Sequence, residues 1–294
     1  MSVMDVVIKW LSPDYPLHEI ILVRSLVALV LTLAVIQFEG GLGLLKTQRP
    51  MLHVIRGLMV AAASMTFYMA LAVMPIAEAS ALFYIAPLLI TGLSVPLLGE
   101  NVGWRRWLAI SVGFAGVILM SGIGTSSFKV ASLLPMIAAL AYALTQLLTR
   151  KLGVTDKASV MTFYISVVFI IISVGFGLIC GDGGFAGSAG DELQFLLRPW
   201  RLPDLYSLLL MVVCGVLVTV VFIMLAQAYR VSEANVIAPF EYVVLPLAIL
   251  WGYLFWNEIP APKTLIGIVL IGGAGLYVFI HEHSLQKHES VSTA

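Results

Sequence analysis

The sequence contains very little charge. Of its 294 residues, 11% are charged and 61% are hydrophobic. A soluble chain carries about 25% charged residues, so this composition excludes an ordinary soluble fold and predicts a surface that faces lipid. The 16 basic residues are balanced by 16 acidic ones. A chain without net charge has no long-range attraction for nucleic acid, and we expect no nucleic-acid partner.

Signatures of catalysis, metal binding and ATP use are also missing. The two cysteines, Cys180 and Cys214, have no CxxC spacing and no histidine nearby to complete a metal site. The C-terminal histidines lack the His-Glu-x-x-His spacing of zinc enzymes, and no phosphate-binding loop occurs. We therefore expect no enzymatic activity, no cofactor and no bound metal.

Long hydrophobic runs dominate the sequence instead. A helix needs about 20 apolar residues to cross a bilayer, and nine runs meet this requirement. One link between them, residues 181–204, is long and includes an amphipathic stretch that we expect to rest on the membrane surface. The predicted spans are Leu17–Phe38, Met51–Met74, Ala77–Leu98, Trp104–Ile123, Val130–Thr149, Ala158–Ile179, Leu205–Tyr229, Ala234–Trp256 and Pro262–Ile280.

Residues 1–11 form a shorter apolar run, which contains Asp5 and Lys9. Eleven helical residues reach only about 17 Å, roughly half of a bilayer. We interpret them as the second half of a tenth span whose first half is missing; a genuine half-helix or an interfacial segment is the alternative. The predicted fold is thus an all-α integral membrane protein with ten transmembrane helices, the first one truncated.

Lysine and arginine are distributed unevenly between the links. With ten spans, the positive-inside rule predicts that both termini are cytoplasmic, in a multi-pass protein of the plasma membrane, the inner membrane of a bacterium. The basic residues assigned to the cytoplasm are Lys46, Arg49, Arg105, Arg106, Arg150, Lys151, Lys157, Arg230 and Lys287, against Lys129, Arg198, Arg201 and Lys263 on the other side.

Two distant stretches, residues 77–100 and 232–258, resemble each other. Each half of the chain then holds five helices, and because five is odd, the second half must be inverted relative to the first. Inverted repeats are typical of secondary transporters, in which two equivalent halves alternate the access to a central site. The matching pairs are Glu78 with Glu233, Pro87 with Pro246, and Glu100 with Glu258.

The first stretch, A-E-A-S-A-L-F-Y-I-A-P…L-L-G-E…R-R-W, resembles the EamA-type repeat of the drug/metabolite transporter superfamily, and so does the second, S-E-A-N-V-I-A-P-F-E-Y. The resemblance covers residues 2–122 and 132–280, leaving a polar tail, residues 281–294, in the cytoplasm. It implies ten helices, two inverted halves and a central substrate cavity. Similar proteins carry amino acids, riboflavin, S-adenosylmethionine, nucleotide sugars or quaternary amines.

Two charged residues inside predicted spans are the first candidates for a substrate site, since a charge in the membrane needs a partner or a water-filled cavity. Glu241 lies between Pro239 and Pro246, where the helix is expected to break, and is a candidate proton or cation site; a structural ion pair is the alternative. Arg24 is expected to pair with Glu241, Glu19 or Asp5, or to bind a carboxylate or phosphate of the substrate.

Other polar residues complete the candidate set. Asp5 and Lys9 share a helix face and can neutralise one another, and together with Glu19 they are candidates for a gate or ion pair. Arg56 is expected to extend to the cytoplasmic interface as an anchor. Buried amides and phenols need partners, which a substrate or a neighbouring helix can provide; these candidates are Tyr68, Tyr84, Tyr142, Gln146, Gln227 and Tyr242.

Small residues line one face of two predicted helices, Ala109, Gly113 and Gly116 in one and Gly267 with Ala274 in the other. Such faces allow helices to pack closely in lipid, either within the chain or in a homodimer. The sequence as a whole predicts a secondary transporter that moves a small organic metabolite of the amino-acid, vitamin or nucleoside-derivative type. A flippase for a lipid-linked substrate, or a membrane scaffold without transport activity, is the alternative.

Overall fold

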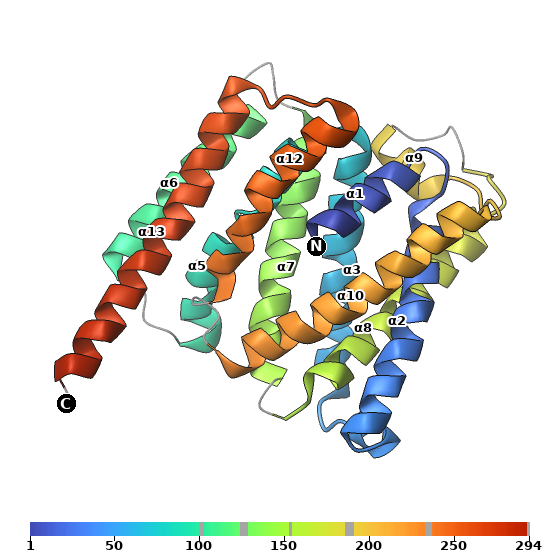
Figure 1. Ribbon diagram of the computed structural model, residues 1–294, viewed down its shortest axis with the longest axis horizontal. Coiled ribbons are helices and arrows are strands. Elements are labelled where there is room, and N and C mark those ends of the chain that lie inside the picture. Colours follow the sequence, from blue (N-terminus) through green and yellow to red (C-terminus); the bar gives the residue numbers. More distant parts are fainter. Residues whose placement is uncertain (100–102, 124–128, 153–154, 186–190, 233–236, 293–294) are drawn as a thin grey trace. The chain divides into compact units, whose positions relative to one another are not determined.

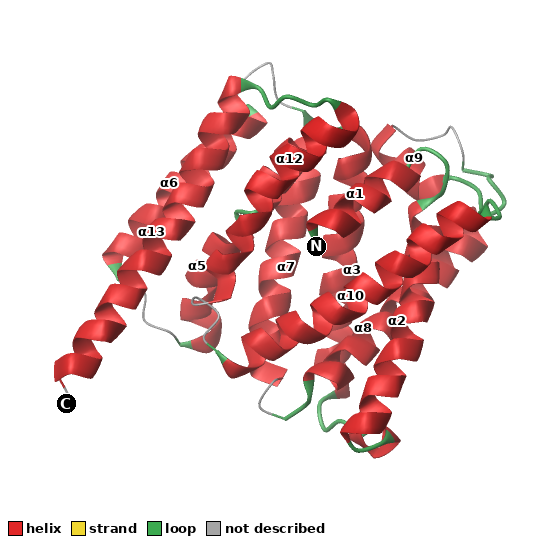
Figure 2. Ribbon diagram, viewed as in Figure 1, coloured by secondary structure: helices red, strands yellow, loops and turns green. Residues whose placement is uncertain are grey.

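The computed structural model describes residues 1–99, 103–123, 129–152, 155–185, 191–232 and 237–292. Every regular element among these residues is helical (Figure 2). In chain order they are α1 (Ser2–Leu11), α2 (Leu17–Glu39), η1 (Leu42–Leu45), α3 (Pro50–Val73), α4 (Ile76–Phe83), α5 (Ala86–Leu98), α6 (Trp104–Ser121), η2 (Val130–Ser132), α7 (Leu133–Leu152), α8 (Ala158–Cys180), α9 (Asp191–Leu197), α10 (Leu205–Val231), η3 (Ala238–Val243), α12 (Val244–Trp256) and α13 (Pro262–Ser292).

The all-α membrane architecture is confirmed. Six helical segments of the described chain are long and apolar enough to cross a bilayer, and two shorter apolar helices follow at Phe240–Trp256 and Pro262–Val278. Each of the nine predicted spans overlaps a helical segment of the described chain, but α12 begins only at Val244, after the 3-10 helix η3, and α13 continues to Ser292, well beyond the predicted end. The six long segments are Leu17–Glu39, Pro50–Val73, Ile76–Leu98, Val130–Leu152, Ala158–Cys180 and Leu205–Val231.

The chain divides into two compact units that do not follow the order of the sequence. Unit 1 comprises residues 1–74 and 148–231, and unit 2 comprises residues 75–147 and 232–294. Each unit therefore combines segments from the first and the second half of the chain. The chain passes between the units at Met74–Pro75, Leu147–Leu148 and Val231–Ser232. The two predicted repeats, residues 2–122 and 132–280, each contribute to both units.

Unit 1 is built around α2, which packs against α8 and α10, while α1 packs against α3 and α10 (Figure 1). Glycine allows the closest of these approaches. A methyl group on Gly215 of α10 would lie 2.8 Å from the carbonyl oxygen of Arg24 and 2.6 Å from Cβ of Val27 on α2. On α3, a methyl group at Gly57 would lie 2.7 Å from Val168 of α8. Helix backbones are thus in near contact where small residues permit it.

The long link between α8 and α10 is held against unit 1. Its helix α9 packs on α2 and α3, and its apolar residue Phe195 is 1% exposed. The imidazole of His18 lies 3.0 Å from the carbonyl oxygen of Leu196. The amphipathic helix predicted in this link exists, but its apolar side packs on protein.

Unit 2 contains α6 and α13 side by side (Figure 1), and α4 beside α12. A methyl group on Gly116 of α6 would lie 3.1 Å from the carbonyl oxygen of Gly267 on α13, and one on Gly113 would lie 3.9 Å from Cβ of Ala274. The two small-residue faces predicted from the sequence therefore pack on each other within one chain. Their composition is explained without a second copy of the protein.

Candidate functional site

Two helices of unit 2 are broken, and both breaks precede a proline. Between α4 and α5, Pro87 has no N–H to donate to the carbonyl of Phe83, so the helix ends at Phe83 and restarts at Ala86. In the second half of the chain, the 3-10 helix η3 precedes α12, whose first turn contains Pro246. Pro87 and Pro246 are the two prolines that the predicted repeat pairs with each other, and η3 contacts α5. Broken membrane helices in corresponding positions are typical of transporter binding sites.

Glu241 and Tyr142 meet beside these breaks. The hydroxyl of Tyr142, on α7, lies 3.0 and 2.9 Å from the two carboxylate oxygens of Glu241, on η3, so its single proton is shared between them. Gln146, one turn further along α7, hydrogen-bonds with Tyr142, and the Phe83 ring lies 5.3 Å from the Tyr142 ring. The site therefore holds a carboxylate with one phenolic donor at a helix break.

Tyr84 and Tyr242 lie next to this cluster in the sequence. Tyr84 follows α4 at the break, is 3% exposed, and its ring lies 5.3 Å from that of Phe83. The ring of Tyr242 lies against α13, where a methyl group on Gly275 would overlap it. The Tyr242 hydroxyl has no hydrogen-bond partner among the described residues. Tyr84, Tyr142, Gln146 and Glu241 thus form one cluster, with Tyr242 at its edge.

Arg24 lies in unit 1 and is almost completely buried, with 1% of its surface exposed. Its Nη1 donates to the hydroxyl of Tyr68 at 3.2 Å and lies 3.8 Å from the sulfur of Met4. Its guanidinium carbon lies 5.3 Å from the centre of the Tyr68 ring and 5.2 Å from that of Phe169. Glu19 and Asp5, the two predicted partners in the same unit, form no ion pair with it among the described residues.

The three residues predicted to form a gate or ion pair occupy separate positions. Asp5 lies on α1 and is 6% exposed. The amine of Lys9 donates to the carbonyl of Met74 at 2.9 Å, which places a positive charge at the C-terminal end of α3. The carboxylate of Glu19 accepts a hydrogen bond from the backbone N–H of Arg201 at 3.2 Å, so it fixes the long link.

Two residues lie where the sequence did not predict them. Gln227 is exposed on α10, where it accepts a hydrogen bond from Arg230 of the same helix at 3.2 Å. Gln227 therefore belongs neither to the cluster around Glu241 nor to the group of residues around Arg24. Arg56 does not extend to the interface but is 4% exposed, because it donates to the hydroxyl of Thr149 at 2.6 Å and to the carbonyl of Met161 at 3.1 Å.

One polar cluster contains none of the residues predicted from the sequence. The imidazole of His53 lies 3.2 Å from the carboxylate of Asp156, which also accepts hydrogen bonds from the hydroxyls of Thr47 and Thr155. The Tyr164 ring stacks on the imidazole with 4.4 Å between ring centres. This cluster joins the starts of α3 and α8. His53 and Asp156 are 103 residues apart, so no local pattern could have paired them.

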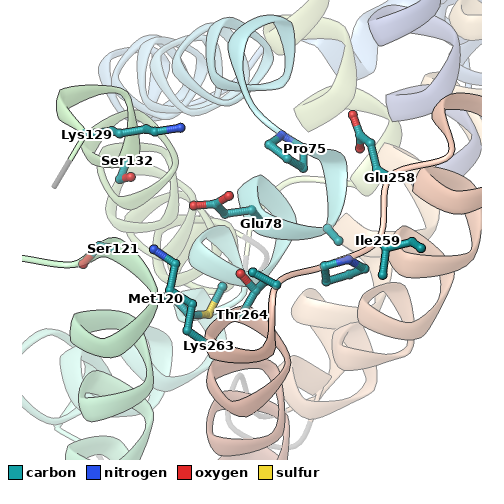
Figure 3. Close-up of a pocket in the computed structure, with 13 residues that line it drawn as sticks. Pro75, Glu78, Met120, Ser121, Lys129, Ser132, Glu258, Ile259, Lys263 and Thr264 are labelled. Atoms are coloured by element: carbon teal, nitrogen blue, oxygen red, sulfur yellow. The ribbon is translucent and has the colours of Figure 1, made fainter. Parts of the chain in front are cut away.

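A cavity of about 230 Å³ opens in unit 2 among the ends of α4, α6, η2 and α13. The carboxylate of Glu78 and the amines of Lys129 and Lys263 turn toward it (Figure 3). Glu258 lies at its edge and accepts a hydrogen bond from the N–H of Ile76 at 3.0 Å, which caps α4. Ligand sites usually measure about 300–1,000 Å³, so this cavity is small for an organic metabolite. Glu100 and Glu233, the other glutamates of the repeat, lie outside the described residues.

Comparisons with known proteins agree with this architecture. Residues 1–122 match the EamA-like transporter family. The S-adenosylmethionine uptake transporter of Rickettsia prowazekii is 27% identical over 291 residues, 98% of this chain and 92% of that protein. The riboflavin transporter of Rhizobium johnstonii is 29% identical over 82% of this chain and 74% of that protein.

Two further comparisons extend the same picture. The pseudopaline exporter of Pseudomonas aeruginosa is 27% identical over 92% of this chain and 88% of that protein. A crystal structure that shares 18% identity superposes on the fold with a TM-score of 0.66 over 94% of both chains. The chain is a multi-pass membrane protein whose residues 1–122 match the EamA-like transporter family, as the sequence led us to expect, and the relatives that match most of its length are transporters.

Proposed function

We propose that the protein is a secondary transporter for a small organic metabolite, of the amino-acid, vitamin or nucleoside-derivative type. The observation that carries this proposal is the Tyr142–Glu241 pair at the break of a membrane helix. A carboxylate inside an apolar span is costly, and a broken helix beside it leaves backbone groups that a substrate can bind. The names of the relatives, which include two uptake or transport proteins and one exporter, support the transport of metabolites.

The mechanism that we propose is alternating access between two inverted five-helix halves, within a ten-helix protein of the bacterial inner membrane whose termini are both cytoplasmic. The corresponding helix breaks before Pro87 and Pro246 support the inverted repeat. A carrier of this kind needs no ATP site, because the substrate gradient or a coupled ion drives it. Glu241 is the residue that we propose for proton coupling, since its carboxylate lies beside a helix break and accepts a hydrogen bond from a tyrosine hydroxyl.

A thermal-shift screen of the purified protein in detergent tests this function. The panel contains S-adenosylmethionine, riboflavin, single amino acids, nucleosides, quaternary amines and several lipids. A ligand that binds the folded state raises Tm with the logarithm of its concentration, and we expect at least one soluble metabolite to do so. Stabilisation by lipids alone, with the protein shown to be folded, would contradict the proposal and favour a lipid flippase.

A further inference from the structure

Arg24 is a buried cation whose hydrogen-bonding capacity is only partly used. Arginine stays charged in proteins and carries five N–H donors. Nη1 has partners in Tyr68 and Met4, but Nε and Nη2 have no hydrogen-bond partner among the described residues. A charge that is removed from water without a full set of partners is strongly destabilising. The described residues therefore leave part of this guanidinium available to a further group.

One edge of the Arg24 guanidinium, formed by Nε and Nη2, has no hydrogen-bond partner among the described residues. The rings of Tyr68 and Phe169 both lie near its carbon, at 5.3 and 5.2 Å. Nε and Nη2 are the neighbouring nitrogens on one edge, and their two parallel N–H bonds match the two oxygens of a carboxylate. The unused donors are thus the pair that binds a carboxylate side-on.

A negative charge lies in the same interior. Helix α1 packs against α3 and α10; its residue Asp5 is 6% exposed, and the preceding residue, Met4, lies 3.8 Å from Nη1 of Arg24. The two side chains form no ion pair, and the Asp5 carboxylate has no hydrogen-bonded partner within the described parts of the chain. Opposite charges that share a buried region without touching can each bind one end of a dipolar group.

We propose that Arg24 and Asp5 bind the two ends of a zwitterionic headgroup, in which a carboxylate stands beside a protonated amine. Arg24 binds the carboxylate through Nε and Nη2, and Asp5 accepts hydrogen bonds from the amine. Met4, Tyr68 and Phe169 form the apolar wall around the headgroup. This inference rests on the proposed function, because the headgroup belongs to the transported substrate.

The first test changes the ligand and leaves the protein intact. Each of the 20 standard L-amino acids is titrated against the purified protein by thermal shift. Each binder is then compared with its carboxamide, which loses the negative charge, and its N-acetyl derivative, which loses the positive one. Loss of a hydrogen bond to a charged group weakens binding by about 10- to 100-fold, and we expect this loss for both derivatives. Inorganic phosphate, an anion without an amine, should not stabilise the protein.

The second test changes the protein and uses Arg56 as a matched control. Arg56 is also buried, but its side chain donates to Thr149 and Met161. Arg24→Lys keeps the charge and removes the fork, so we expect only a small loss of Tm without ligand, since a single side-chain hydrogen bond to Tyr68 is affected, and at least a tenfold loss of amino-acid affinity. Arg56→Lys should lower the Tm without ligand and leave the ligand-induced shift unchanged. Asp5→Asn should weaken the free amino acid more than its N-acetyl derivative.

The outcomes separate this inference from the proposed function. If riboflavin, nucleosides or quaternary amines stabilise the protein and no amino acid does, the headgroup proposal is overturned while the transport proposal stands. The headgroup proposal is also overturned if an amino acid and its carboxamide bind equally well, or if the Arg24→Lys variant binds amino acids with full affinity. If no soluble metabolite binds at all, both proposals fail.

Discussion

Replacement of Glu241 with glutamine is expected to reduce transport by about 10- to 100-fold while the protein still folds. Glutamine has nearly the same shape and can still accept a hydrogen bond from Tyr142, but it carries no charge. Hydrogen bonds to a charged group contribute about 1.5–3 kcal/mol, which corresponds to this factor in rate or affinity. If Glu241 takes up a proton during the cycle, the variant should also lose the dependence of transport on pH. Uptake of the best binder into proteoliposomes at several pH values measures both effects.

Two controls accompany this substitution. Glu39→Gln removes a carboxylate from the exposed end of α2 and should transport within about twofold of the unmodified protein. Tyr142→Phe removes the donor and keeps the charge, so it should lose less activity than Glu241→Gln, and the double variant should show coupling between the pair. A Glu241→Gln protein with normal transport at every pH would remove Glu241 from the mechanism.

Gly215→Ala is expected to destabilise the protein by about 1–3 kcal/mol, or roughly 2–10 °C in Tm. The added methyl group would lie 2.8 Å from the carbonyl oxygen of Arg24 and 2.6 Å from Cβ of Val27. A backbone oxygen cannot turn aside as a flexible side chain does, so α10 must move away from α2. Since Arg24 is the residue against which Gly215 packs, ligand affinity should fall as well. Thermal unfolding in detergent, with and without the best binder, measures both changes.

The matched control lies on the neighbouring helix α8. A methyl group on Gly175 would meet no atom within 4 Å, so Gly175→Ala should leave Tm and ligand binding nearly unchanged. If Gly215→Ala and Gly175→Ala melt at the same temperature, the close approach of α10 to α2 is not a feature of the folded protein.

The helices could be predicted from the sequence because lipid imposes a simple requirement. An apolar run of about 20 residues between breakers forms a span in any context, and runs such as 158–179 match the observed Ala158–Cys180 closely. The irregular helix near Pro246 was also predicted, since proline has no N–H to complete the helix, but the break before Pro87 was not, because Ala77–Leu98 was predicted as one continuous span. The two compact units could not be predicted from the sequence, because each unit joins stretches that are far apart in the chain.

The sequence indicates how far along a span a residue lies. It does not indicate whether the side chain of that residue is exposed or packs against another helix. Gln227 and Gln146 both lie within apolar runs, yet the first is exposed and the second is 3% exposed beside Tyr142. Arg56 lies close enough to a helix end to reach water, but hydroxyl and carbonyl partners on other helices hold it inside. Such differences depend on the neighbouring helices, which local sequence patterns do not identify.

Counterflow in proteoliposomes tests the central claim most directly. Liposomes that contain the purified protein are loaded with the best soluble binder in unlabelled form, and a trace of the labelled compound is added outside without ATP. A secondary transporter exchanges the two, so we predict a transient accumulation of label that protein-free liposomes do not show and that Glu241→Gln strongly reduces. A compound that binds the protein but never accumulates above the protein-free level would contradict the assignment of the protein as a transporter for it.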